Sequence, residues 1–234
     1  MTASDHPPVA GTPAFDTLSH LLHTRYSCRA FLPSPVPRTT IGQVLATAQR
    51  TASWCNAQPW QLTIASGATL ARLRDALAAA VPATPPNSDL PWPREYRGVY
   101  QDRRRECGFG LYDAVGIARG DRAASARQAA KNFTMFGAPH VAIVSSDEAL
   151  GVYGAVDCGA YVSNFMLAAH SLGLGAIAQA ALAAYPAVLR EVLGIGTDRH
   201  IVCAISFGWP DPEHPANHFR TTRADVAQVV DWKD

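Results

Sequence analysis

Hydrophobic residues recur along the chain with helical spacing in some segments and with strand spacing in others. Intervals of three and four residues, typical of amphipathic helices, occur around 15–25, 41–48, 70–81, 156–172 and 188–193. Alternating or continuous apolar positions, typical of strands, occur at 60–65, 140–145, 176–180 and 201–207. Few strands among many helices predict an α+β fold in which helices cover the sheet.

Individual residues sharpen several of these predictions. Thr39 or Thr40 is expected to cap the helix that follows the prolines at 33, 35 and 37. In 60–65 a large apolar side chain stands at every second position, which predicts a strand with one buried face. The helix at 156–172 is rich in small residues, so it is expected either at the centre of the fold or at a subunit interface.

The domain prediction is one unit from 14 to 234, preceded by a disordered arm. Residues 1–13 are rich in Pro, Ser, Thr and Gly and lack periodicity, as disordered segments do. Five of the 17 prolines crowd into 82–93, which is therefore expected to be a surface connection without helix or central strand. The polar, helix-forming stretch 94–135 follows, and the whole 82–135 excursion is interpreted as a lid over a cleft.

Composition narrows the class of protein. The 234 residues are 48% hydrophobic, which is enough for a large core, and the net charge of +1 argues against a nucleic-acid binder. The five cysteines are far apart and no metal-ligand spacing is present. No apolar run is long enough to span a bilayer and no export signal is recognisable, so we expect a soluble, cytoplasmic protein that does not act on membranes.

The most informative motif lies at the end of the first helical segment. Arg25, Ser27 and Arg29 alternate along 25–31, and two guanidinium groups with a hydroxyl form a donor set suited to a phosphate. An ordinary surface arginine cluster at a helix C-terminus, where cations interact favourably with the helix dipole, explains this motif equally well. The heptapeptide alone leaves both interpretations open.

A second motif follows about 30 residues later. The loop 53–60 carries amide side chains and two tryptophans, which suit a planar ring system that forms hydrogen bonds. Together with the segment 217–223, Asn-His-Phe-Arg-Thr-Thr-Arg, the two motifs resemble the FMN-dependent nitroreductase family, in particular its nitrobenzoate-reductase-like branch. The resemblance extends over roughly 15–232. It implies a nitroreductase-like α+β sandwich whose mixed or antiparallel sheet is covered by helices, assembled as an intertwined homodimer with FMN at each subunit interface.

The resemblance also assigns roles to individual residues. The binders of the FMN phosphate, ribityl chain and pyrimidine would be Arg25, Tyr26, Ser27 and Arg29. The partner subunit would contribute Ser53, Trp54, Asn56 and Gln58. The flavin edge near N5 would lie along Gln179, Ala180 and Ala181, and the C-terminal cations on the phosphate would be Arg220 and Arg223. Trp54 and Asn132 would contact substrate.

Two departures from the family pattern leave details open. Some members have a lysine where this chain has Thr221, so the sequence does not decide whether Arg220 or Arg223 holds the phosphate. Trp54 occupies a loop position that is often a small serine, which is expected to alter the substrate pocket.

The activity implied is a ping-pong reduction of nitroaromatic or similar electron-poor compounds. NAD(P)H as co-substrate would reduce the flavin at N5, and Arg29 would stabilise the negative charge of the reduced ring. A reductive dehalogenase or flavin-fragmenting enzyme of the same fold is an alternative. However, Glu95, Tyr100 and Lys131 do not reproduce the Glu, Tyr, Lys spacing of dehalogenase lids. A non-catalytic flavin-binding protein is a third possibility.

Overall fold

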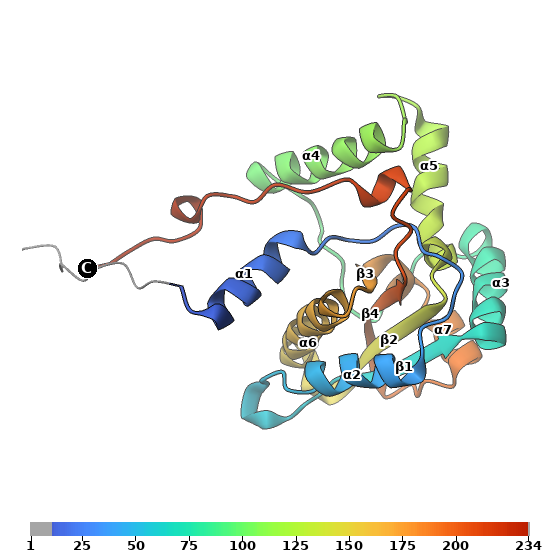
Figure 1. Cartoon of the computed structure of the whole chain (residues 1–234). Coiled ribbons are helices and arrows are strands. Elements are labelled where there is room, and N and C mark those ends of the chain that lie inside the picture. The colour runs from blue at the N-terminus through green and yellow to red at the C-terminus, as the bar shows by residue number, and fades with distance from the viewer. Residues whose placement is uncertain (1–10, 234) are drawn as a thin grey trace, which may run out of the picture.

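The computed structural model describes residues 11–233, which are built around a four-stranded antiparallel sheet (Figure 1). The strands are β1 (Gln61–Ser66), β2 (His140–Asp147), β3 (Gly175–Gln179) and β4 (Arg199–Gly208), in the order β1-β2-β4-β3. The predicted α+β fold is confirmed, and the sheet is antiparallel. The expected arm falls mainly on 1–10, outside the described residues.

Helices cover both faces of this sheet. They are α1 (Pro13–Thr24), α2 (Arg38–Ala48), α3 (Gly67–Ala83), α4 (Val99–Ala114), α5 (Arg122–Ala130), α6 (Gly151–Ser171) and α7 (Pro186–Leu193). The central strand β2 is almost fully buried, because Ala142 and Val144 pack against α2 and α6 while Val141 and Ile143 pack against α3 and α7. Within residues 11–233, no helix is both long enough and apolar enough to cross a bilayer.

The strand predicted at 60–65 is confirmed, because Trp60, Leu62 and Ile64 pack in the cluster with α2 and α6. The opposite face is exposed at Gln61 and is buried only at Ala65, which belongs to the cluster under α3. The one-sided pattern did not show this because alanine contributes little apolar signal. Neither Thr39 nor Thr40 caps α2, since Pro37 is the N-cap and the chain enters the helix at Arg38 without a side-chain cap.

Two proline positions also differ from expectation. Pro82, assigned to the irregular connection, lies in the last turn of α3. A proline there removes the hydrogen bond to the carbonyl of Ala78, but Ala78 is exposed and water can replace the lost donor. Pro13, assigned to the arm, begins α1, and the Thr12 side chain accepts a hydrogen bond from the Phe15 amide. Proline is favoured in a first helical turn because its missing N–H is not needed there.

The segment after α1 lies directly against β3. Ser27 forms a parallel bridge with Ala176, and the Cys28 amide donates to the Ala176 carbonyl at 3.1 Å. This approach requires a glycine, because a Cβ on Gly175 would lie 2.6 Å from the Cys28 Sγ. The arginines at 25 and 29 are thus carried by a segment that the sheet holds in place.

Replacing Gly175 by alanine is therefore expected to destabilise the protein by about 1–3 kcal/mol, the usual cost of overpacking. Urea unfolding measures the effect. Gly42→Ala is the matched control, because a Cβ at Gly42 meets nothing within 4 Å and alanine favours the helix. Equal stability of Gly175→Ala and the wild type would show that this segment is not closely packed on β3.

Candidate functional site

A cavity of about 860 Å³ opens between the end of α1 and the C-terminal segment 219–223. Four arginines line it, namely Arg25, Arg29, Arg220 and Arg223. The remaining lining residues include Tyr26, Ser27 and Cys107 of α4, and none of the lining residues is Asp or Glu. Residues nearly 200 positions apart in the sequence therefore form one cation-rich wall.

Within the described part of the chain, these four guanidinium groups form no salt bridge. Among residues 11–233, salt bridges join other cations, for example Arg190 to Asp89 at 2.8 Å, but none involves an arginine of the cavity. Burial, followed by the charge of Arg223, lowers the pKa of Arg25, and burial lowers the pKa of Arg29. Such an arrangement is unfavourable unless an anion enters, and phosphate fits the guanidinium donors well.

Asn217 connects the two segments that carry the arginines. Its Oδ1 accepts a hydrogen bond from the Arg29 amide at 2.8 Å, and its Nδ2 donates to the Ala30 carbonyl at 2.8 Å. Its own carbonyl accepts from Arg220 Nη1 at 2.6 Å. Asn217 is 2% exposed, so a buried amide side chain fixes the position of the α1 segment relative to the tail.

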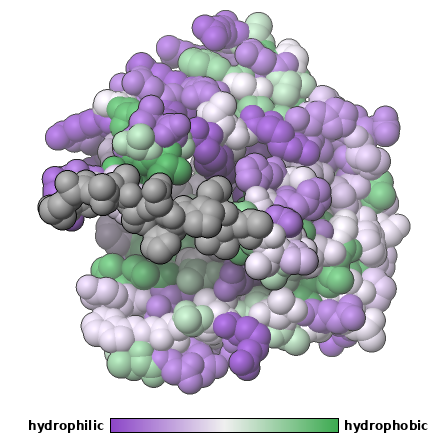
Figure 2. Space-filling view, turned by 60° about the vertical axis from the view of Figure 1, so that its left-hand side comes forward, coloured by the Kyte–Doolittle hydropathy of each residue, from purple (hydrophilic) through white to green (hydrophobic). Residues whose placement is uncertain are grey.

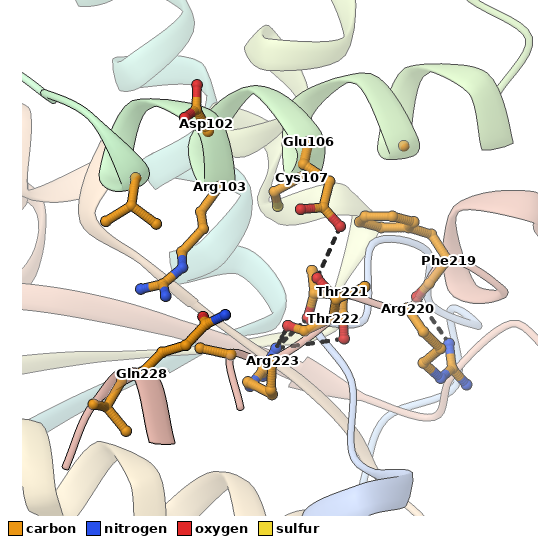
Figure 3. A pocket seen from close by; sticks show the side chains of 14 residues that line it. Asp102, Arg103, Glu106, Cys107, Phe219, Arg220, Thr221, Thr222, Arg223 and Gln228 are labelled. Atoms are coloured by element: carbon orange, nitrogen blue, oxygen red, sulfur yellow. Dashed lines mark hydrogen bonds between the residues drawn. The ribbon is translucent and has the colours of Figure 1, made fainter. Parts of the chain in front are cut away.

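Further contacts fix the guanidinium groups themselves. Arg29 Nη1 donates to the Ser27 carbonyl at 3.1 Å, which turns the side chain back along its own segment. The Arg220 guanidinium lies 3.9 Å from the centroid of the Tyr26 ring, a cation–π contact. Arg223 Nη1 donates to the Thr221 hydroxyl at 2.6 Å (Figure 3). The Thr221 hydroxyl thus helps to fix the guanidinium group of Arg223, which is two positions further along the chain.

The loop predicted to complete the site lies elsewhere in the chain. The Trp54 amide donates to the Asp157 carboxylate of α6, and the Trp54 ring packs edge-on against Tyr153 at 4.6 Å. At the other end of α6, His170 Nε2 and the Thr24 hydroxyl, beside Arg25, are 2.8 Å apart. Thirteen helical residues separate these contacts, or about 20 Å. The structure does not bring the loop and the arginines together within one chain.

The loop itself is held in an uncommon backbone conformation. Cys55, Asn56 and Gln58 have positive φ angles of 51°, 53° and 49°. The Ser53 hydroxyl accepts a hydrogen bond from the Gln58 amide at 2.9 Å, which closes the turn. The Trp54 side chain is 62% exposed. The loop thus exposes its indole ring at the surface, away from the residues that line the arginine cavity.

The predicted flavin-edge segment follows β3. Gln179 is buried, and its Nε2 donates to the Asn132 carbonyl at 3.0 Å and to Asn132 Oδ1 at 3.1 Å. Its Oε1 accepts from the Ser206 hydroxyl. Gln179 thus joins β3 to β4 and to the segment after α5, while Ala180 is exposed at the strand end. The structure places Asn132 beside Gln179, and Ala181 is half-buried next to them.

The comparisons with known proteins agree with this architecture. The sequence profile of the Nitroreductase family matches residues 22–209. The chain belongs to the Nitroreductase family. The 4-nitrobenzoate reductase of Nocardioides sp. is 32% identical to it, covering 97% of this chain and 95% of the relative. Nitroreductase NfnB of Mycolicibacterium smegmatis is 34% identical, covering 90% of each chain.

A solved structure of the family superimposes closely. The FMN-dependent nitroreductase NfnB from Mycobacterium smegmatis, in complex with NADPH, has a TM-score of 0.89 and 32% sequence identity, covering 94% of this chain and 99% of that chain. The predicted nitroreductase-like fold is thereby confirmed, including its covered sheet.

Sequence reasoning missed three contributors to the nitroreductase cavity. Cys107 of α4 and Phe219 line it, but neither carries a sequence signal for this, because α4 is about 110 positions away from the tail. Asn217 was noted only as part of the tail motif. The Asn217 side chain binds the Arg29 amide and the carbonyls of Ala30 and Asp211, and sequence spacing does not reveal such contacts.

His170 provides a pH-dependent feature beside the arginines. Burial, followed by the charge of Arg25, lowers its pKa below the ordinary 6.5. As the pH falls through about 6.5, the unfolded chain takes up a proton that the folded chain does not, so the folded state loses stability on acidification. The loss ends below the lowered pKa of the folded state.

His170→Gln should therefore reduce the drop in melting temperature between pH 7.5 and pH 5.5. This interval spans the ordinary pKa of histidine, about 6.5. Glutamine retains a hydrogen-bonding group for Thr24. Part of the drop should remain in the variant, because burial also lowers the pKa of His140. An unchanged pH profile would exclude His170 as a source of acid sensitivity.

Proposed function

We propose that this chain is an FMN-dependent oxidoreductase that uses NAD(P)H to reduce nitroaromatic or similar electron-poor compounds. The observation that carries the proposal is the cavity whose four arginines form no salt bridge with residues 11–233 and whose lining there includes no carboxylate. The relatives support the chemistry, since they are named for 4-nitrobenzoate reduction and for FMN-dependent nitroreduction with NADPH.

The cavity residues fit the phosphate end of FMN. Arg25, Arg220 and Arg223 would hold the phosphate, and their mutual repulsion would be relieved by its charge. Ser27 lies between Arg25 and Arg29 and offers a hydroxyl to the ribityl chain. Arg29, which is half-buried between the buried residues Cys28 and Ala30, would stabilise negative charge on the pyrimidine edge. Bound FMN supplies the redox chemistry by accepting a hydride from NAD(P)H and passing electrons to the acceptor.

We further propose that two copies of the chain form a homodimer and share each site. The apolar residues Phe15, Leu18 and Leu22 of α1 are half or more exposed, as are Val152, Tyr153 and Val156 of α6. Figure 2 shows hydrophobic residues, drawn in green, on the face turned forward. Soluble monomers rarely expose such a surface. The loop of 53–58 would then reach the arginines of the other subunit.

The lid interpretation of 82–135 remains a proposal of its own. The segment contains α4 and α5, and α4 contributes Cys107 to the cavity wall, which supports a cover over the site.

We place the protein in the cytoplasm, where NAD(P)H is available. Reductive dehalogenation, flavin fragmentation and non-catalytic flavin binding find no support among the named relatives.

The test is anaerobic stopped-flow reduction of the FMN-loaded protein by NADH and by NADPH, followed by mixing with 4-nitrobenzoate, a halotyrosine or oxygen. We expect flavin reduction by at least one nicotinamide and rapid reoxidation by the nitro compound. A colourless protein that takes up no added FMN would refute the proposal. Turnover of the halotyrosine without turnover of nitrobenzoate would favour the dehalogenase alternative.

A further inference from the structure

The C-terminal segment that carries Arg220 and Arg223 is attached to α4 at two points. The Thr222 hydroxyl donates a hydrogen bond to Glu106 Oε1 at 2.8 Å, and the Phe219 ring lies against Gly110 one helical turn further along (Figure 3). A Cβ on Gly110 would come within 2.6 Å of Phe219 Cε2. Because Gly110 has no side chain, it leaves the space that the Phe219 ring occupies.

The two residues that contact α4 alternate with the two cavity arginines along the C-terminal segment 219–223. Phe219 precedes Arg220, and Thr222 precedes Arg223, so each arginine follows a residue that is fixed to α4. A second cavity, of about 880 Å³, lies between α4 and the tail and shares Cys107, Phe219 and both arginines with the first. Displacement of α4 from the tail would thus change both cavities together.

We propose that Gly110/Phe219 and Glu106/Thr222 form a latch that couples the anion site to α4. A phosphate held by Arg220 and Arg223 fixes the tail, and the tail in turn holds α4 in its place over the site. The four latch residues are positioning residues, since they act through the arginines and the helix. The inference rests on the proposed function and adds a physical link between cofactor occupancy and the proposed lid.

The first measurement is the affinity for FMN and for riboflavin, which lacks the phosphate, by fluorescence titration. Gly110→Ala should weaken FMN binding about tenfold, equivalent to about 1.4 kcal/mol, and leave riboflavin binding unchanged. Gly108→Ala is the matched control, because it makes the same change on the same helix at a position where a Cβ meets nothing within 4 Å. It should bind both flavins as the wild type does.

The second measurement is hydrogen exchange of α4 with and without FMN. In the wild type and in Gly108→Ala, FMN should slow exchange across Val99–Ala114, whereas riboflavin should not. Thr222→Val, which removes only the hydroxyl donor on an exposed segment, should lose this protection, and Thr222→Ser should retain it. Thr222→Val also tests the latch if Gly110→Ala fails to fold.

Two results would overturn the latch. One is equal FMN affinity of Gly110→Ala and Gly108→Ala, and the other is FMN protection of α4 that Thr222→Val leaves intact. Equal weakening of FMN and riboflavin would likewise contradict it, because the effect would not act through the phosphate. A wild-type protein that binds no FMN would instead refute the proposed function.

Discussion

Arg29→Ala is expected to weaken FMN binding about 30- to 150-fold, because the variant loses charge-assisted hydrogen bonds worth about 2–3 kcal/mol. Arg29 is held by the Ser27 carbonyl and by the Asn217 contact to its amide, so no neighbouring cation can take its place without rearranging the segment. Reduction of the remaining bound flavin by NAD(P)H should also slow, since the negative charge on the reduced ring loses its stabilising cation.

Two other arginine variants serve as comparisons for Arg29→Ala. Arg29→Lys keeps the charge but loses the planar donor geometry, so its affinity should lie between those of the wild type and Arg29→Ala. Arg38→Ala removes an exposed arginine outside the cavity and should change neither affinity nor reduction rate. Normal values of both quantities in Arg29→Ala would remove Arg29 from the mechanism.

Val156→Glu is expected to dissociate the proposed homodimer and to empty both flavin sites with it. Val156 is 59% exposed on α6, close to the Tyr153 ring on which Trp54 packs. An unpaired charge buried there would cost several kcal/mol, enough to weaken dimerisation at least about a hundredfold. Sedimentation velocity and flavin absorbance measure the two consequences in one sample.

Ala71→Glu is the matched control for this surface. It introduces the same charge at an exposed position of α3, which lies on the other side of the molecule from α1 (Figure 1). This variant should remain dimeric and yellow. If Val156→Glu remains dimeric with full FMN content, the apolar face of α6 is not the interface.

Periodicity was sufficient for most of the elements, but not for their ends. The pattern in 188–193 predicted α7, and Gly194 ends it in the left-handed conformation with φ of 68°. The start of α2 could not be predicted from Thr39 or Thr40, because both have good capping side chains and the chain geometry at Pro37 decides the position. A helix end depends on the path of the chain into it, which local composition does not specify.

The types of residue in the site could be predicted from the sequence, but their arrangement in space could be predicted only in part. The alternation of Arg25, Ser27 and Arg29 indicated an anion site, and the structure adds Arg220 and Arg223 to the same cavity, whose described lining includes no carboxylate. The role of Asn217 could not be inferred, because its partners lie about 190 positions away. The contacts of α4 with the C-terminal segment 219–223 could not be predicted either, because these two parts of the chain are also far apart in the sequence.

The 53–58 loop and the arginines, which the proposed flavin site needs together, lie apart within one chain. Within one chain, the loop contacts α6 at Asp157, and Thr24 beside Arg25 contacts it at His170, about 20 Å further along the helix. The apolar faces of α1 and α6 are exposed near both of them. One flavin site would therefore take its arginines from one subunit and its loop from the other.

Subunit mixing tests this claim most directly. Arg29→Ala and Asn56→Ala/Gln58→Ala are co-expressed with different affinity tags, and heterodimers are isolated by tandem purification for measurement of FMN content. If sites are shared, each homodimer retains little flavin after purification, whereas the heterodimer combines one intact arginine cavity with one intact loop and retains about one FMN per dimer. No recovery of flavin in a heterodimer whose wild-type counterpart is fully loaded would contradict the shared site.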